Sequence, residues 1–120
     1  MGFQISTTRS FVAGHQLRGY DGCVEELHSH NWQVRVVVSA SVLDRMGLVM
    51  DFQELENVMK AVIDPLQNVN LNELPRFSGV NPSAENLAGY IADSLLLPKN
   101  VQLVSVEVWE TAGNSAIYAP

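Results

Sequence analysis

The chain has three histidines, His15, His28 and His30, and all of them fall within one stretch of sixteen residues. His28 and His30 open a run that alternates apolar and polar residues and then becomes β-branched, which is typical of a strand. At a rise of roughly 3.3 Å per residue, their imidazoles point to the same face of that strand. Three neutral imidazoles with an open fourth position form the catalytic type of zinc site, with Zn–N distances of about 2.0–2.1 Å. We therefore predict that these histidines bind one Zn²⁺ ion; the alternative is a pair of surface imidazoles at a strand edge.

The elements that must position these ligands follow the order strand, strand, helix, helix, strand, strand. The strands are expected at residues 3–12, 30–42, 101–110 and 115–119. Asp51 can cap the first helix, whose apolar positions keep the i, i+3, i+4 spacing of one buried stripe until Pro65. Pro82 suits the first turn of the second helix, which Pro98 ends. This order predicts an α+β fold in a single domain over residues 1–120, with an antiparallel sheet and both helices on one face.

Composition narrows the classes of function. The chain has 120 residues, 47% of them hydrophobic, which is enough for one core. A net charge of −6 with only seven Lys and Arg argues against a nucleic-acid partner. The apolar stretches are shorter than the roughly 18–20 residues that a membrane span needs. A single cysteine cannot form an internal disulfide, which suits a reducing cytoplasm. We expect a cytoplasmic protein that acts on a small molecule.

Glu110 ends the third expected strand, in phase with the valines of its apolar face. A carboxylate in that position can pair with a planar N–H/NH₂ edge, such as the amidine-like edge of a pterin or purine ring. Such fork-type hydrogen bonding is strong because the acceptor is charged. The alternative is a strand-end glutamate that reaches into solvent.

These residues resemble the 6-pyruvoyl-tetrahydropterin synthase and 6-carboxy-tetrahydropterin synthase family, and the resemblance covers nearly the whole chain. Phe11-Val-Ala-Gly-His15 looks like the F-x-A-x-H of that family, and Leu27-His-Ser-His-Asn-Trp32 looks like its L-H-G-H-N-[YF], with a serine in place of glycine. The remaining similar segments are Gly47–Phe52 (G-[MW]-[VI]-x-D-F), Leu71-Asn72 (L-N), Asn81–Glu85 (N-P-T-[SA]-E) and Glu110-Thr111 (E-[TS]).

The resemblance implies the tunnelling fold, in which subunits complete a β-barrel as trimers that stack into hexamers, with active sites between subunits. It also implies zinc and a substrate of the 7,8-dihydroneopterin triphosphate type, whose pterin ring Glu110 and Thr111 anchor. In relatives the zinc binds hydroxyls of the substrate side chain and acidifies adjacent groups. A cysteine thiolate moves the protons, and triphosphate elimination or side-chain cleavage follows. Cys23 lies in the corresponding loop; a lone cysteine is otherwise most often an inert buried residue.

Two departures from the family pattern leave the base and the product open. Relatives carry L-D-H after the first helix, where the Asp and His relay protons, whereas Gln67 and Asn68 stand here and do not titrate near neutral pH. Cys23 is spaced between the carboxy-type C-x-x-x-H-G-H and the longer pyruvoyl-type pattern. Glu25 holds the position of a glutamate found in a third type, and it could act as a base if desolvation raised its pKa. Two exposed loop glutamates are the plainer alternative.

Three hypotheses follow from these residues. The first is a zinc-dependent lyase on 7,8-dihydroneopterin triphosphate, with Cys23 or Glu25 as base and a 6-carboxy, 6-pyruvoyl or 6-hydroxymethyl pterin as product. The second is a non-catalytic pterin- or purine-binding homologue that kept zinc and Glu110 but lost the proton relay. The third is a zinc hydrolase with zinc-bound water as nucleophile, which would need a general base that no residue provides. A triphosphate would have to be bound by a local cluster drawn from the few cations of the chain.

Overall fold

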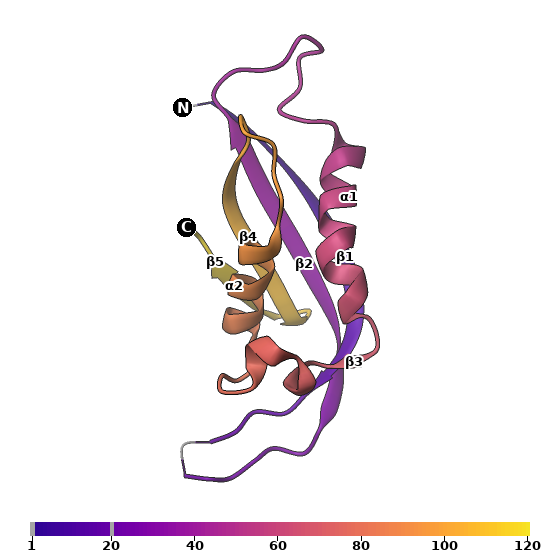
Figure 1. The fold of residues 1–120 in the computed structure, drawn as a ribbon, viewed down its shortest axis with the longest axis vertical. Coiled ribbons are helices and arrows are strands. Elements are labelled where there is room, and N and C mark those ends of the chain that lie inside the picture. Colours follow the sequence, from indigo (N-terminus) through magenta and orange to yellow (C-terminus); the bar gives the residue numbers. More distant parts are fainter. Residues whose placement is uncertain (1, 20) are drawn as a thin grey trace.

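The computed structural model describes residues 2–19 and 21–120 (Figure 1). One sheet runs along the molecule, and two helices lie against one of its faces. The strands are β1 (Phe3–His15), β2 (His28–Ala40), β3 (Val69–Asn70), β4 (Gln102–Thr111) and β5 (Asn114–Tyr118). The helices are α1 (Phe52–Ile63) and α2 (Ala84–Ser94), and short 3₁₀ turns span Asp64–Leu66, Leu71–Glu73 and Pro75–Phe77. The predicted α+β class is confirmed, and the elements follow the predicted order except that β3 lies between the two helices.

The strand order is β3-β1-β2-β4-β5, and the four long strands are antiparallel to their neighbours, as predicted. The sequence pattern does not predict β3, which pairs in parallel with β1 through Ala13 and Gly14. Asn68 makes this possible, because its φ of 61° turns the chain and its backbone N–H donates to the carbonyl of Val12. Asparagine is one of the few residues with a side chain that tolerates this left-handed conformation.

The first two strands are longer at the histidine end than expected. They pair along their whole length, from Phe3 opposite Ala40 to His15 opposite His28. The expected bounds of 3–12 and 30–42 therefore stop short of the pairing that aligns two of the histidines.

The helix starts follow their capping residues. Asp51 caps α1 as predicted, because its side chain accepts a hydrogen bond from the backbone N–H of Gln53. The placement of Pro82 in the first turn of α2 is wrong. Ser83 is the capping residue there, and its hydroxyl accepts from the backbone N–H of Asn86. Pro82 precedes the helix, and its carbonyl group is free to bind a side chain elsewhere.

The core lies between the sheet and the two helices. Alternate residues of β2 enter it, so the residues between them face the other side of the sheet, where Asn31, Gln33 and Arg35 are exposed. The fully buried apolar side chains of β2, α1 and α2 are Trp32, Val34, Val36, Val38, Leu55, Met59, Ile63, Leu87, Ala88 and Ile91. His28 and His30 share the phase of Trp32, so they stand at the end of this core face. Among the described residues, neither helix is long and apolar enough for a membrane crossing.

Candidate metal centre

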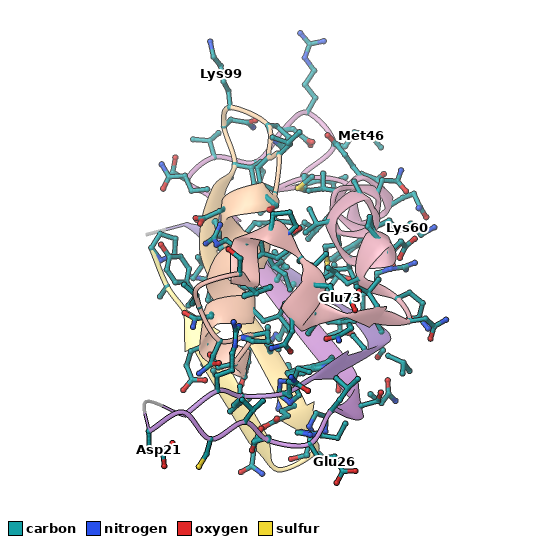
Figure 2. The ribbon with its side chains drawn as sticks, turned by 60° about the horizontal axis from the view of Figure 1, so that its bottom comes forward. Asp21, Glu26, Met46, Lys60, Glu73 and Lys99 are labelled. Atoms are coloured by element: carbon teal, nitrogen blue, oxygen red, sulfur yellow. The ribbon has the colours of Figure 1, made fainter. Side chains whose placement is uncertain are left out.

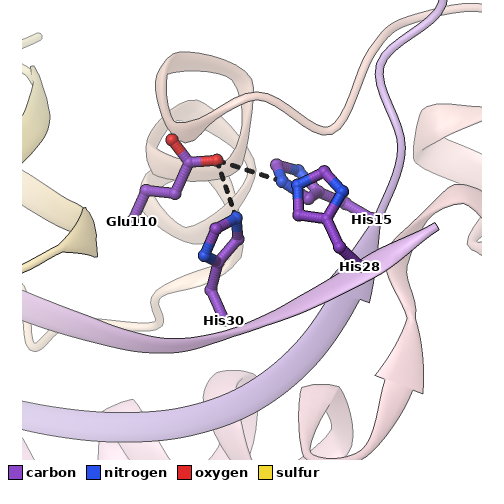
Figure 3. Close-up of side chains that lie close together, drawn as sticks. All are labelled: His15, His28, His30 and Glu110. Carbon is purple, nitrogen blue, oxygen red and sulfur yellow. Dashed lines mark ion pairs between the residues drawn. The ribbon is translucent and has the colours of Figure 1, made fainter. Parts of the chain in front are cut away.

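Four side chains converge where β1, β2 and β4 meet at one end of the core: His15, His28, His30 and Glu110 (Figure 3). One potential ligand atom from each lies within 4.8 Å of those of the others. The imidazole ring centroids are 4.7–5.0 Å apart. The structure therefore brings together all three predicted zinc ligands and adds the carboxylate that was assigned to the substrate ring.

Pairing between strands places these groups. The β1–β2 register sets His15 opposite His28, while the two-residue period of β2 sets His30 on the same face. Trp32 lies beneath the cluster, with its ring centroid 5.0 Å from that of His15 and 5.4 Å from that of His30. Its indole N–H donates to the carbonyl of Ala13 at 3.1 Å, so this buried ring is held against both imidazoles.

Backbone carbonyl groups set the orientation of two imidazoles. Nδ1 of His15 lies 2.8 Å from the carbonyl oxygen of Pro82, and Nδ1 of His28 lies 2.8 Å from that of Glu26. Because a carbonyl oxygen only accepts, each Nδ1 carries a hydrogen, and in the neutral imidazole Nε2 then has the lone pair that can bind a metal. Metal-binding histidines in proteins are usually oriented by such an N–H contact on the other nitrogen. Both residues are therefore held in a form that can bind a metal.

The Glu110 carboxylate lies against the imidazole nitrogens. Its Oε1 is 3.0 Å from Nε2 of His15 and 3.1 Å from Nε2 of His30. Both Nε2 atoms are buried, yet neither has a hydrogen-bond partner. Burial lowers the pKa of His30, although the nearby Glu110 carboxylate acts in the opposite direction. A carboxylate oxygen that faces two imidazole nitrogens can share a cation with them, either a proton, which makes the contact an ion pair, or a metal ion. Three imidazoles are a donor set that Zn²⁺ prefers.

A pocket of about 450 Å³ lies at this end of β2 and β4, and His30, Glu110 and Thr111 contribute to its lining, together with Gln33 and Trp109, which pair with each other on the sheet face opposite to the core. The Thr111 hydroxyl accepts a hydrogen bond from the side-chain amide of Asn114 at 2.9 Å. Both residues that were predicted to contact the substrate ring therefore share one pocket with a predicted metal ligand.

Cys23 and Glu25 lie elsewhere in the chain. They belong to the loop between β1 and β2, which extends beyond the end of the sheet (Figure 1). Both line a different pocket, of about 600 Å³, and the Cys23 thiol is exposed. The carboxylate of Glu25 accepts from the backbone N–H of Leu17 at 3.0 Å, and the Glu25 N–H donates back to the Leu17 carbonyl. Within one chain, the structure does not bring either candidate base to the histidines.

Gln67 and Asn68 bind the outer edge of β1. The side-chain oxygen of Gln67 accepts from the backbone N–H of Val12 at 3.0 Å, and the Asn68 N–H donates to the Val12 carbonyl at 2.6 Å. These contacts stabilise the start of β3 beside β1. The residues that stand in place of the Asp-His relay thus have a structural role here.

The sequence analysis missed two asparagines that support the site. The side-chain amide of Asn72 forms two hydrogen bonds with the backbone of Gln16, each of 2.8 Å, and Asn81 does the same for Arg18 at 2.8 and 2.9 Å. For the residues that directly follow His15, each side-chain amide provides the backbone hydrogen bonds that a neighbouring strand would otherwise provide. Their positions in the Leu-Asn and Asn-Pro motifs were the only available signal.

Three of the basic side chains already bind acidic or carbonyl groups of the same chain. Arg9 pairs with Asp64 at 2.7 Å, and Arg76 pairs with Asp93 at 2.8 Å. The Arg18 guanidinium donates to three backbone carbonyl groups, those of Phe77, Ser78 and Val80. Lys99 lies at the end of the molecule opposite to the loop that contains Asp21 and Glu26 (Figure 2). A triphosphate-binding cluster stays unassigned within one chain.

Comparison with known proteins identifies the family of this chain. The sequence profile of a family described as 6-pyruvoyl tetrahydropterin synthase matches residues 4–120. The human 6-pyruvoyl tetrahydrobiopterin synthase is 34% identical, over 96% of this chain and 90% of the relative. A 6-carboxy-5,6,7,8-tetrahydropterin synthase of Synechocystis is 36% identical, over 91% of this chain and 87% of the relative. The solved Caenorhabditis elegans 6-pyruvoyl tetrahydropterin synthase superposes with a TM-score of 0.82 at 22% identity, over 98% of this chain and 95% of that one, which shows the shared fold.

Proposed function

Because the chain belongs to the 6-pyruvoyl tetrahydropterin synthase family, we propose that it is a zinc-dependent lyase that acts on 7,8-dihydroneopterin triphosphate. The observation that carries this proposal is the convergence of three imidazoles and Glu110 beside one pocket. Relatives named for a 6-pyruvoyl and for a 6-carboxy product match this chain at similar identity, so either product is consistent with the comparisons.

The histidines would hold the metal, with His15 and His28 kept in their binding form by the Pro82 and Glu26 carbonyl groups. When bound there, Zn²⁺ supplies a Lewis acid that acidifies the C–H and O–H groups of the substrate side chain. Glu110 would accept two hydrogen bonds from the N–H/NH₂ edge of the pterin, and the Thr111 hydroxyl lies in the same pocket. Trp109 would contribute an aromatic wall to this pocket.

Cys23 is the better supported of the two candidate bases. The Glu25 carboxylate already accepts a backbone hydrogen bond that closes its own loop, whereas the Cys23 thiol is exposed. Because the loop extends away from the histidines of its own chain, Cys23 would act at the metal centre of a neighbouring subunit. The site would then be complete only in an oligomer, and the missing triphosphate ligands would come from the same interface.

Association of subunits would follow from the uncovered edges of the sheet, and the resemblance to the family makes a hexamer the expected assembly. β3 covers only Ala13 and Gly14 of β1, and β5 is the other edge, with Ile117 62% exposed. Open strand edges favour pairing with another chain. Light scattering should therefore give six times the 13.2 kDa mass of the chain.

A charge at that edge should break the assembly. We expect Ile117→Lys to dissociate the hexamer, because a lysine on an edge strand opposes pairing with another strand. Val42→Lys is the matched control, since Val42 is 74% exposed and lies outside the strands. A wild-type chain that stays monomeric at micromolar concentration would contradict both the hexamer and a site shared between subunits.

Incubation of the purified protein with 7,8-dihydroneopterin triphosphate tests the proposed reaction. With zinc, mass spectrometry should detect loss of triphosphate and a 6-carboxy or 6-pyruvoyl pterin, and after chelation the substrate should persist. Unchanged substrate in the presence of full zinc occupancy would reject the lyase.

A pterin-binding homologue without catalytic activity is the second candidate. It is favoured by Gln67 and Asn68, whose contacts with Val12 serve the sheet and whose side chains do not relay protons at neutral pH. Pterin binding that persists without turnover, and that is lost in Glu110→Ala, would favour this candidate. If the protein is a lyase, a 6-hydroxymethyl product would indicate that Glu25, and not Cys23, is the base.

A further inference from the structure

We propose that Arg18 is a positioning residue of the metal centre: its guanidinium group holds residues 77–82 in the place from which the Pro82 carbonyl group orients the His15 imidazole. The effect on His15 depends only on contacts within this chain. The effect on zinc rests on the proposed function.

The His15 imidazole is oriented by a segment that lies outside the helices and strands. The His15 side chain is 1% exposed, and its Nδ1 donates to the Pro82 carbonyl oxygen at 2.8 Å. Pro82 lies between the 3₁₀ turn that ends at Phe77 and α2, which begins at Ala84. Carbonyl groups in helices and strands are fixed by the backbone hydrogen bonds of those elements, but residues 78–82 belong to neither. The Pro82 carbonyl group therefore needs side chains from elsewhere to hold its segment in place.

The Arg18 guanidinium binds the carbonyl groups of this segment. Nη2 lies 2.7 Å from the Phe77 oxygen and 3.0 Å from the Val80 oxygen, and Nη1 lies 3.2 Å from the Ser78 oxygen. A guanidinium suits this task because its N–H donors form a rigid planar fork, and hydrogen bonds from a charged donor are stronger than neutral ones. One side chain, three positions after His15, thus holds three carbonyl groups of the irregular segment.

The Arg18 backbone is bound by the same segment. The Asn81 side-chain oxygen accepts from the Arg18 N–H at 2.8 Å, and the Asn81 amide donates to the Arg18 carbonyl at 2.9 Å. The Asn81 carbonyl in turn accepts from the side chain of Asn86, in the first turn of α2, at 2.9 Å. These contacts form a closed circuit that runs from His15 along the chain to Arg18, across to Asn81, and through Pro82 back to His15. The Pro82 carbonyl group is held against His15 while these contacts persist.

Removal of the guanidinium should loosen this circuit. The segment before Asn81 would lose the common donor of its carbonyl groups, so the Pro82 carbonyl group would be held less firmly against Nδ1 of His15. Loss of the groups that orient a metal-binding histidine typically costs about 10–100-fold in metal affinity. We expect Arg18→Met to lower zinc affinity within this range.

Arg76→Met is the matched control for Arg18→Met. Methionine keeps much of the aliphatic length of arginine but has no N–H donor. Arg76 is in the 3₁₀ turn that also contains Phe77, where it pairs with Asp93 at 2.8 Å and lies 5.6 Å from the centroid of the Tyr90 ring. Its removal also weakens contacts between this region and α2, but it leaves the contacts of Arg18. A general loss of stability should therefore appear in both variants, and a loss of His15 orientation only in Arg18→Met.

NMR of metal-free protein with isotope-labelled histidine reports this orientation without zinc or substrate. The chain has only three histidines, so the imidazole signals can be assigned with His28→Ala and His30→Ala. The Nδ1–H signal of His15 should exchange slowly with solvent in the wild type and in Arg76→Met, because this hydrogen is buried and hydrogen-bonded. In Arg18→Met the signal should be shifted or lost. Zinc affinity, measured by competition with a chelator, should fall in Arg18→Met and stay at the wild-type value in Arg76→Met.

The outcomes separate the role of Arg18 from the proposed function. An unchanged His15 signal or an unchanged zinc affinity in folded Arg18→Met would overturn the positioning role, and so would equal losses in Arg76→Met. If Arg18→Met does not fold, Arg18→Lys decides the question by the same measurements, because it keeps the charge but replaces the planar fork with one ammonium group. A wild type that binds no zinc would overturn the proposed metal centre, while the His15 signal would still decide whether Arg18 orients His15.

Discussion

Replacing Cys23 by alanine should lower kcat for 7,8-dihydroneopterin triphosphate by about 10²–10⁴-fold, the usual contribution of a general base. Zinc content and pterin affinity should stay at wild-type values, because Cys23 does not belong to the metal cluster or line the Glu110 pocket. The measurement is steady-state turnover of the purified protein at saturating substrate, together with metal analysis of each preparation.

Glu25→Gln is the matched comparison for Cys23. A glutamine keeps an oxygen that can accept from the Leu17 N–H, so the loop should retain its shape while the carboxylate is lost. We expect a much smaller loss of turnover than in Cys23→Ala. The reverse order, with a large loss only in Glu25→Gln, would identify Glu25 as the base and contradict the assignment of Cys23.

The second large effect concerns the metal. His28→Ala should reduce zinc affinity by more than the roughly 10–100-fold that removal of an outer contact costs, because a direct ligand is lost. His28 is preferable to His15 for this test. His15 is buried, so its removal would also leave a cavity in the core, whereas His28 is only half-buried.

Metal analysis after dialysis should find one zinc per wild-type chain and far less in His28→Ala. Arg35→Ala is the control, since Arg35 is exposed on the opposite face of β2 and does not line the Glu110 pocket. Full zinc occupancy in His28→Ala would contradict the three-histidine site. An unchanged free energy of unfolding in the presence of chelator would show that the loss concerns the metal and not the fold.

The sequence alone determined the local framework of this protein. The alternation along β2 places His28 and His30 on the face of Trp32, because side chains in a strand point to opposite sides in turn. The cap of α1 at Asp51 and the phase of Glu110 with the buried valines of β4 could be predicted for the same reason. Each of these features depends on residues a few positions apart, so a short sequence pattern predicts it.

Only the tertiary structure decided how the site is assembled. His15 is oriented by Pro82, 67 residues away in sequence, and the residues after His15 are held by Asn72 and Asn81 across separations of 56 and 63 residues. The bulge at Glu110 arises from the pairing of β4 with β5. Such contacts depend on strand register and on backbone carbonyl groups. Because every residue has a backbone carbonyl group, no residue type in the sequence indicates where these contacts form. That is why the sequence could predict that the three histidines lie together, while their orientation, and the placement of Cys23 away from them, could not be predicted.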